Sequence, residues 1–321
     1  MLKSFTPQAI TTHLSHPCFS RKPSARQRLI AIPHKSDNRR LLECIHAPVE
    51  NSTSPPVLFI HGAFHAAWCF GLLQDYLQER GIESFAVSLR NHGNSWRSSG
   101  YDAVTLTTLS RDVEDAVRHL FIRNGKLIPY ILVGHSMGGA VGGVPPAALL
   151  LLFSFSPIGP QTTWLSNWYH RHHLATIGSI IGMRPKTIFD SPNLVRDAFF
   201  HQGTPNEIVD KIYSLMEEDE ALFSMLDLTV KNVFKGGREA AVRVATHPDS
   251  PLQNRIGVFC ASEDKIINEK VWTETSQVYH TTPVIIEGVG HDGFLDMEYE
   301  KIGSEIFSWL EEKTESIKGR A

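Results

Sequence analysis

Short apolar runs rich in β-branched and aromatic residues alternate along the chain with segments of helical periodicity. The runs predict strands over residues 29–32, 41–46, 57–60, 83–89, 130–134, 147–154, 256–261 and 283–287. The periodic segments predict helices over residues 68–80, 106–123, 269–279 and 299–312. Because strands and helices alternate, the pattern predicts an α/β fold with a mostly parallel, doubly wound sheet.

The pattern changes between residues 159 and 254, where strand-like runs stop and short helical segments are predicted over residues 205–217 and 221–233. We interpret this stretch as a helical cap insertion. The chain then divides into a flexible basic N-terminal segment (1–27), an α/β core (28–158 and 255–312), the cap (159–254) and a C-terminal tail (313–321). Ligands of open parallel sheets bind at the carboxyl ends of the strands, so we expect the chemistry there.

Composition narrows the classes of function. A net charge of −3 over 321 residues gives no reason to expect a nucleic-acid partner. No apolar run reaches the length of about 18 residues that a membrane-spanning helix needs. The four cysteines form no CxxC pair of the kind that binds zinc. Residues 1–36 hold six Lys or Arg and no Asp or Glu, so a mitochondrial transit peptide is the alternative to a cytoplasmic location.

The stretch "GHSMG", residues 134–138, follows a predicted strand and fits the pattern G-x-S-x-G. A serine in this pattern lies on a tight turn between strand and helix, which exposes its hydroxyl above the sheet. Gly134 and Gly138 let the backbone pack closely around that turn. We therefore predict that Ser136 is a catalytic nucleophile and that the backbone N–H of Met137 helps to bind an oxyanion.

A serine hydroxyl needs a base to remove its proton, and the base needs a carboxylate to orient it. The predicted base is His291, which follows the last predicted strand in the glycine-rich loop "EGVGHDGF". The predicted carboxylate is Asp264, which follows the preceding strand in "ASEDKII". The adjacent Glu263 should point elsewhere, and Asp292 is too close in sequence to His291 to orient it well. The resulting order along the chain is the Ser…Asp…His order of one hydrolase architecture.

The segment "FIHGAFHAAW" follows the predicted strand over residues 57–60. Gly62 permits a tight turn, after which the N–H of Ala63 can join that of Met137 in binding an oxyanion. We expect His61 to hold this loop in place and His65 to serve in packing.

These blocks resemble those of the α/β-hydrolase superfamily, in particular its serine esterases and lipases, over residues 28–312. "HGAFHAAW", "VSLRNHGNS", "GHSMGG", "ASEDKII" and "GVGHDGF" are similar to the family's landmarks and occur in its order. The first block also looks like that of a subgroup with small-ester esterases and hydroxynitrile lyases. The resemblance implies Ser136, Asp264 and His291 as nucleophile, acid and base, Ala63 and Met137 as oxyanion donors, and no metal or organic cofactor.

The segment after the serine departs from the family's pattern. In similar proteins the helix that follows the nucleophile runs for several turns. Here the stretch 142–146 contains two glycines and two prolines, which disfavour helix interiors and should end the helix after about two turns. Three explanations stay open: a natural shortening compensated by the cap, an error in the gene's predicted boundaries, or a decayed enzyme.

We expect a serine hydrolase that cleaves a carboxylic ester or related acyl bond of a small molecule; the oligomeric state stays open. The alternatives are thioester or lactone hydrolysis in specialised metabolism, and a catalytically silent ligand-binding homologue. In the cap, Trp164 and Trp168 are candidates for an acyl pocket, with aromatic core packing as the alternative. The run "YHRHH", residues 169–173, lacks an i, i+4 histidine pair and indicates a solvated segment rather than a metal site.

Overall fold

The computed structural model describes residues 5–99, 104–141, 144–155, 189–217, 250 and 252–319. Its strands are β1 (Arg28–His34), β2 (Asp37–Ala47), β3 (Val57–Ile60), β4 (Ser84–Val87), β5 (Ile122–Arg123), β6 (Lys126–Leu127), β7 (Ile131–His135), β8 (Ala148–Leu152), β9 (Ile256–Ala261) and β10 (Val284–Ile286). Its α-helices are α1 (Pro7–Leu14), α2 (Gly71–Gln78), α3 (Leu106–Phe121), α5 (Pro192–Phe199), α6 (Asn206–Leu215), α9 (Glu269–Tyr279) and α10 (Tyr299–Lys318). Short 3-10 helices are η1 (Pro17–Ser20), η2 (Ala67–Phe70), η3 (Ser136–Ala140) and η5 (Gly293–Leu295).

Eight strands form one sheet in the order β1-β2-β4-β3-β7-β8-β9-β10. The pairs β1–β2 and β2–β4 are antiparallel, whereas every pair from β4 to β10 is parallel. Strands β3, β7, β8 and β9 are buried along their whole length, as parallel strands covered on both faces should be. These pairings confirm the predicted α/β fold with a mostly parallel sheet.

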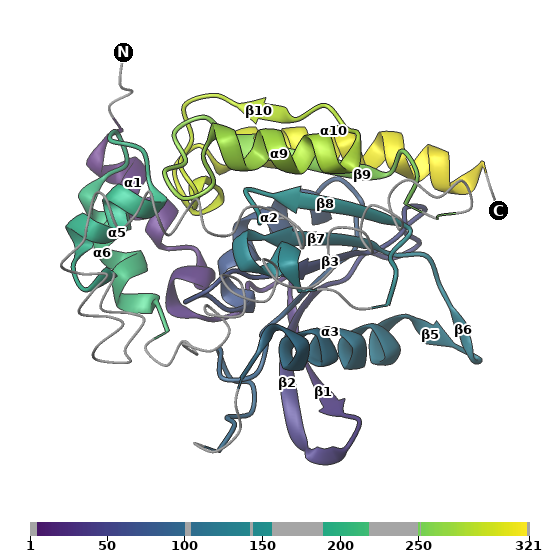
Figure 1. Cartoon of the computed structure of the whole chain (residues 1–321). Helices are drawn as coiled ribbons and strands as arrows, with labels where there is room; N and C mark the ends of the chain where they lie inside the picture. The colour runs from purple at the N-terminus through teal and green to yellow at the C-terminus, as the bar shows by residue number, and fades with distance from the viewer. Residues whose placement is uncertain are drawn as a thin grey trace.

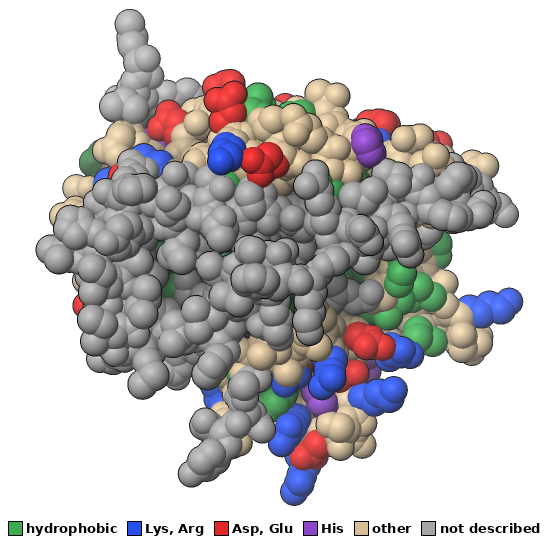
Figure 2. Space-filling model, viewed as in Figure 1, with side chains coloured by type: hydrophobic (Ala, Val, Ile, Leu, Met, Phe, Trp, Pro, Cys, Tyr) green, Lys and Arg blue, Asp and Glu red, His purple; other side chains and the backbone are tan. Residues whose placement is uncertain are grey.

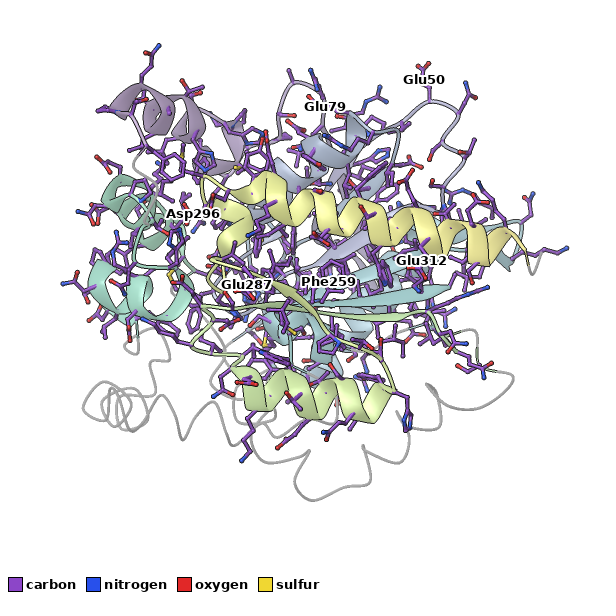
Figure 3. The ribbon with its side chains drawn as sticks, turned by 90° about the horizontal axis from the view of Figure 1, so that it is seen from above. Glu50, Glu79, Phe259, Glu287, Asp296 and Glu312 are labelled. Carbon is purple, nitrogen blue, oxygen red and sulfur yellow. The ribbon has the colours of Figure 1, made fainter. Side chains whose placement is uncertain are left out.

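Helices lie on both faces of the sheet (Figure 1). Seen from above, α2 and α10 lie on one side of the sheet and α9 lies on the other (Figure 3). Phe259 of β9 lies in the interior, with its ring 6.4 Å from that of Trp309 on α10, whereas Glu50 and Glu79 lie at the outer surface (Figure 3). Burial of such large apolar side chains is the main favourable contribution to the fold.

The small hairpin of β5 and β6 was not predicted, although the sequence contains its turn signal. Asn124 and Gly125 connect the two strands with φ values of 50° and 75°. Both values belong to the left-handed region that two-residue hairpin turns use, and Asn-Gly is the preferred pair there. The hairpin directly follows α3, whose predicted start is marked by a capping box between Thr105 and Thr108.

The N-terminal segment differs from the prediction of a flexible tail. Residues 7–14 form α1 and residues 17–20 form η1, and the side chains of Cys18 and Phe19 are buried in the core. Pro7 and Pro17 each occupy the first turn of their helix. A proline is tolerated there because that position needs no N–H donor.

Part of the predicted cap falls within the described residues. The helix predicted over residues 205–217 is α6, and α5 precedes it. The helix predicted over residues 221–233, Trp164, Trp168 and the segment 169–173 lie outside the described residues. Helices α5 and α6 lie beside the end of the sheet toward which β7 and β8 point (Figure 1). The division of the chain into core and cap stays a prediction.

Charged side chains of both signs mix on the surface in the region of β1, β2 and α3 (Figure 2). Asp37 pairs with Arg39 and Arg40, and Glu114 pairs with Arg118. Exposed pairs of this kind contribute little to stability. Among the described helices, none has both the length and the apolar character that crossing a bilayer requires.

Candidate active site

Ser136 lies at the corner where β7 gives way to η3. Its φ of 50° belongs to the left-handed region, which a non-glycine residue rarely adopts and which therefore indicates local strain. Two hydrogen bonds hold the strained carbonyl oxygen of Ser136. The hydroxyl of Ser154 donates to it at 2.6 Å, and the N–H of Phe155 donates to it at 3.2 Å. The predicted nucleophile therefore occupies a strand–turn–helix corner that its surroundings fix in place.

Close packing around this corner leaves no room for side chains at the neighbouring glycines. A Cβ atom at Gly134 would lie 2.6 Å from the backbone of η3, and one at Gly138 would overlap the carbonyl oxygen of Ile60. A Cβ atom at Gly62 would lie 2.7 Å from the Cβ of Ser136. The loop after β3 therefore touches the serine turn, which only a glycine permits.

The helix after Ser136 is short, as the two glycines and two prolines of residues 142–146 predicted. Helix η3 ends at Ala140, and Val141 already has extended dihedral angles, with φ −88° and ψ 93°. All five residues of β8, the next strand, are nevertheless buried. Strand β8 is therefore covered despite the short connection.

His291 and Asp264 meet above the sheet, on the loops that follow β10 and β9. Nδ1 of His291 lies 2.6 Å from Oδ2 of Asp264, and both side chains are buried. Oδ1 of Asp264 accepts hydrogen bonds from the N–H groups of Ile266 at 2.7 Å and Ile267 at 2.8 Å. Because a carboxylate only accepts, Nδ1 of His291 carries a proton and Nε2 is left as the basic nitrogen. This is the tautomer that a general base requires.

Ser136 and His291 line the same cavity, which encloses about 40 Å³. The rest of its described lining is mostly apolar: Ala63, Phe64, Met137, Phe155, Phe189, Phe199 and Ile266, with His65 and His135. Nε2 of His291 is buried and makes no hydrogen bond to the described residues, the Ser136 hydroxyl included. A bond between base and nucleophile often forms only when substrate binds, so the shared cavity is compatible with this pair.

The loop after β3 is held by His61, the residue expected to support it. Nε2 of His61 accepts a hydrogen bond from the N–H of Leu89 at 3.0 Å, so its Nδ1 donates to the carbonyl of Gly62 at 2.7 Å. In a trans peptide the C=O and N–H groups point in opposite directions. The N–H of Ala63 therefore points away from the His61 ring, and Ala63 itself lines the cavity.

Three polar residues beside this site were not predicted to take part in it. Asp292 is fully buried, with Oδ2 3.0 Å from Nε2 of His65 and Oδ1 3.7 Å from Nε2 of His135. Burial acts to raise the pKa of Asp292, but its neighbours, His65 first among them, outweigh burial and lower that pKa below its usual value. Burial also lowers the pKa of His135 well below its usual value, so that ring is neutral. No local sequence pattern indicated these contacts.

His135, His291 and Asp292 are also a group of potential metal ligands, the one group found among the described residues. Their ligand atoms lie within 4.8 Å of one another. Nε2 of His135, however, faces the carbonyl oxygen of His291 at 3.1 Å, and a metal ion would have to displace that contact. A metal ion bound through Nε2 of His135 would therefore compete with an existing contact within the protein.

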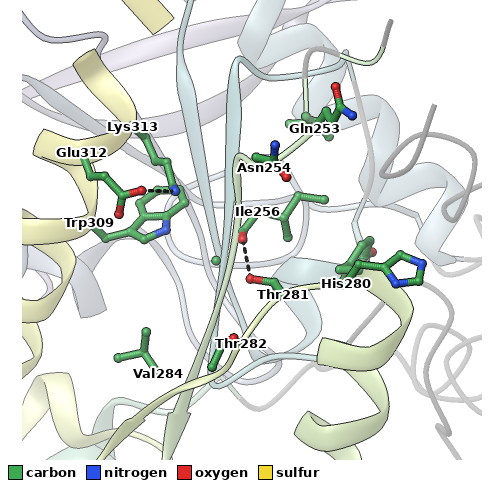
Figure 4. A pocket seen from close by; sticks show the side chains of 13 residues that line it. Gln253, Asn254, Ile256, His280, Thr281, Thr282, Val284, Trp309, Glu312 and Lys313 are labelled. Carbon is green, nitrogen blue, oxygen red and sulfur yellow. Dashed lines mark hydrogen bonds and ion pairs between the residues drawn. The ribbon is translucent and has the colours of Figure 1, made fainter. Parts of the chain in front are cut away.

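A larger cavity, of about 530 Å³, lies at the opposite edge of the sheet, before β9 and β10 (Figure 4). Three of its polar side chains make contacts within the protein: Lys313 contacts Glu312 at 2.7 Å, and the hydroxyl of Thr281 donates to the carbonyl of Ile256 at 3.2 Å. No serine or cysteine is among its described lining residues. The smaller cavity beside Ser136 is therefore the better candidate for catalysis.

Comparison with known proteins gives a family match over most of the chain. The sequence model described as "Alpha/beta hydrolase family" matches residues 57–301. The chain is 31% identical over 118 residues to the Mus musculus protein named "sn-1-specific diacylglycerol lipase ABHD11", a match that covers 34% of this chain and 35% of the relative. It is 30% identical over 132 residues to "Putative methylesterase 15, chloroplastic" of Arabidopsis thaliana, covering 41% of this chain and 28% of the relative. The matched stretch therefore spans about a third of these relatives' length.

Solved structures show a similar fold over nearly the whole chain. A thermophilic esterase from Thermogutta terrifontis has a TM-score of 0.64 at 17% identity and covers 89% of this chain and 99% of its own. A putative lipase from Acinetobacter baumannii has a TM-score of 0.64 at 18% identity over all of both chains. The haloalkane dehalogenase DatA from Agrobacterium tumefaciens has a TM-score of 0.61 at 14% identity, covering 93% of this chain and 99% of its own. At such identities the likeness shows the fold alone.

Proposed function

Because this chain belongs to the alpha/beta hydrolase family, whose model matches residues 57–301, we propose that it is a serine hydrolase that cleaves a carboxylic ester through an acyl-enzyme. The relatives named lipase, esterase and methylesterase support ester hydrolysis in general. The observation that carries the specific mechanism is the contact of His291 Nδ1 with Asp264 at 2.6 Å, beside the cavity that Ser136 shares with His291.

In this mechanism Oγ of Ser136 attacks the carbonyl carbon of the ester while its proton passes to Nε2 of His291. The imidazolium that forms is stabilised by Asp264. The carbonyl oxygen becomes an oxyanion and accepts hydrogen bonds from the N–H groups of Ala63 and Met137. When the C–O bond breaks, His291 returns the proton to the departing alcohol. Water then attacks the acyl-enzyme with His291 as base, which releases the acid and restores Ser136.

The walls of the cavity favour an apolar acyl or alcohol group. None of its described lining residues is Asp, Glu, Lys or Arg, and Phe64, Phe155 and Phe199 are among them. An uncharged ester group of small to medium size suits such walls, because burying a charged group there would be costly. A thioester or a lactone presents the same kind of acyl carbon and belongs in the same test.

The proposal is tested by hydrolysis of 4-nitrophenyl esters of increasing chain length, followed by thioesters and lactones. Ser136→Ala and His291→Ala should each lower kcat by about 10³-fold or more, because the remaining groups cannot form the acyl-enzyme. His280→Ala, at the larger cavity, is the matched control and should leave kcat unchanged. Full activity of folded Ser136→Ala would contradict the proposal. A folded native chain inactive on the whole panel would favour the silent homologue instead.

A further inference from the structure

Asp292 is a second buried carboxylate beside the site, and the proposed mechanism does not use it. Its side chain is 0% exposed, and that of His65 is 1% exposed. Oδ2 of Asp292 lies 3.0 Å from Nε2 of His65, which is closer than Nε2 of His135 at 3.7 Å lies to Oδ1. A buried carboxylate is very unfavourable unless a positive charge lies beside it. The structure must therefore supply such a charge close to Asp292.

The positions of the protons identify His65 as the source of that charge. Nδ1 of His65 lies 2.9 Å from the carbonyl oxygen of Ala63, which can only accept, so Nδ1 carries a proton. In a neutral His65 the lone pair of Nε2 would face the carboxylate oxygen of Asp292 at 3.0 Å, which is repulsive. A second proton on Nε2 removes the repulsion and neutralises the buried carboxylate. The neutral His135 adds its Nε2–H, which donates to the carbonyl of His291 and lies 3.7 Å from Oδ1 of Asp292.

Asp292 also joins the loops that carry the proposed catalytic groups. It directly follows His291, and His135 directly precedes Ser136. His65 belongs to the loop after β3 that contains Ala63. The backbone N–H of Asp292 donates to the carbonyl of Phe199 at 2.8 Å, which connects α5 to the same point. A displacement of this carboxylate would therefore shift both the proposed base, His291, and the loop that contains Ala63.

We propose that Asp292 and a doubly protonated His65 form a buried ion pair that positions the oxyanion loop relative to His291. This inference rests on the proposed function, since it assigns the Ala63 loop to oxyanion binding. His61 holds the carbonyl of Gly62 and His65 holds the carbonyl of Ala63, so both peptide planes that flank Ala63 are fixed. Asp292 holds His65 in turn. Asp292 acts through its neighbours and is a positioning residue.

Variants of His65 separate its two contacts. His65→Asn places an amide near the position of Nδ1, which keeps the hydrogen bond to the carbonyl of Ala63 and removes the contact with Asp292. His65→Gln places its amide near the position of Nε2, which keeps a contact with Asp292 and removes the hydrogen bond to Ala63. Asp292→Asn keeps the shape of the side chain and removes its charge. The matched control is Asp296→Asn: Asp296 is also buried, pairs with His201 at 3.3 Å and lies beside α5 and α6, away from the cavity lining (Figure 3).

Kinetics with 4-nitrophenyl acetate distinguish positioning from a structural role. Asp292→Asn should lower kcat about 10- to 100-fold with KM changed less than about threefold, because it misplaces the oxyanion donor and Asp292 is not among the residues that line the cavity. The two His65 variants should lower kcat by a similar factor. Asp296→Asn should keep kcat within about twofold of the native value, whatever its effect on the unfolding midpoint. The double variant His65→Gln/Asp292→Asn should be no slower than the slower single variant, because both break the same pair.

An NMR measurement of the ring nitrogens of His65 tests the ion pair independently of activity. Both nitrogens should be protonated in the native chain at neutral pH, and one in Asp292→Asn. A single protonated nitrogen in the native chain would overturn the pair. If the native chain is active and folded Asp292→Asn has the same kcat, that result would also overturn the inference, and it would leave the proposed function intact. A native chain without esterase activity would overturn the proposed function and, with it, the positioning role.

Discussion

Backbone strain gathers beside the oxyanion donors. Nine described non-glycine residues have a positive φ, and four of them are asparagines, which tolerate that region. Two others, Phe64 at 65° and Ser136 at 50°, line the candidate cavity. Phe64 directly follows Ala63, and Ser136 directly precedes Met137. Since strain persists only where the surroundings enforce it, this placement supports a functional reason for both turns.

The packing of Gly139 gives a prediction at this scale. A Cβ atom there would overlap Oγ of Ser154 and lie 2.8 Å from Cδ2 of Leu151. Gly139→Ala should therefore lower the free energy of unfolding by about 1–3 kcal/mol, as overpacking in a core does. It should also weaken the Ser154 hydrogen bond that holds the carbonyl of Ser136. Urea unfolding of the two proteins measures the change.

Two further variants decide whether overlap is the cause. Gly139→Ala combined with Ser154→Gly should recover part of the loss, because it removes the overlapping atoms. Gly319→Ala is the control without overlap, since its nearest contact would be 3.5 Å and its φ is −68°. Equal unfolding midpoints for Gly139→Ala and Gly319→Ala would contradict the packing argument.

Sequence reasoning at the residue scale works where a local pattern accompanies the chemistry. Ser136, Asp264 and His291 each follow a strand, so their meeting above the sheet could be predicted. The pair of His65 and Asp292 could not be predicted, because it joins two loops far apart in the chain and neither loop has a recognisable pattern for it. We expected His65 to serve in packing, and the structure adds a charged contact to that expectation.

Among the elements, α1 and η1 test whether the N-terminal segment is part of the fold. Phe19 of η1 is fully buried, and its ring lies 5.1 Å from that of His13 on α1. Phe19→Ala should lower the free energy of unfolding by about 3–5 kcal/mol, because it leaves a large cavity. Leu29→Ala is the matched control: Leu29 is 57% exposed, so its truncation should change stability by less than about 0.5 kcal/mol. Equal changes in the free energy of unfolding for Phe19→Ala and Leu29→Ala would support the prediction of a flexible N-terminal segment instead.

The elements with clear local signals were the most predictable ones. The strand over residues 57–60, the strand over residues 256–261 and the helix over residues 269–279 match their predicted bounds. Apolar runs and capping residues mark these elements locally, as Asn268 does at the start of α9. The short helices α1 and η1 also make distant contacts, in addition to their local caps at Thr6 and His16. His13, for example, bonds the carbonyl of Leu295 at 2.9 Å, which no local pattern predicts.

For the whole molecule, buried neutral histidines predict sensitivity to acid. Burial lowers the pKa of His61 and His135 well below the usual value of 6.5. As the pH falls through 6.5, these two rings bind protons in the unfolded chain but stay neutral in the folded state. Stability contributed by these rings is therefore present above that pH and lost below it. Lowering the pH from about 7.5 to about 5.5 should reduce the free energy of unfolding by about 1 kcal/mol per ring. Urea unfolding at the two pH values measures this loss.

His201 serves as a control of opposite sign. A hydrogen bond to Asp296 raises the pKa of His201, so its contribution to stability is present at low pH and lost as the pH rises through that pKa. His201→Asn should therefore increase the free energy of unfolding that is lost at the lower pH, whereas His61→Asn should decrease this loss. Stability that is equal or greater at the lower pH in the native chain would contradict this account.

The most direct test of the central claim, that Ser136 is an activated nucleophile, is labelling of the full chain with a fluorophosphonate and mapping of the adduct by mass spectrometry. We predict one adduct, on Ser136, that is absent from Ser136→Ala and is formed far more slowly by His291→Ala, because the hydroxyl then lacks its base. A folded native chain that forms no adduct, or forms it on another residue, would contradict the account.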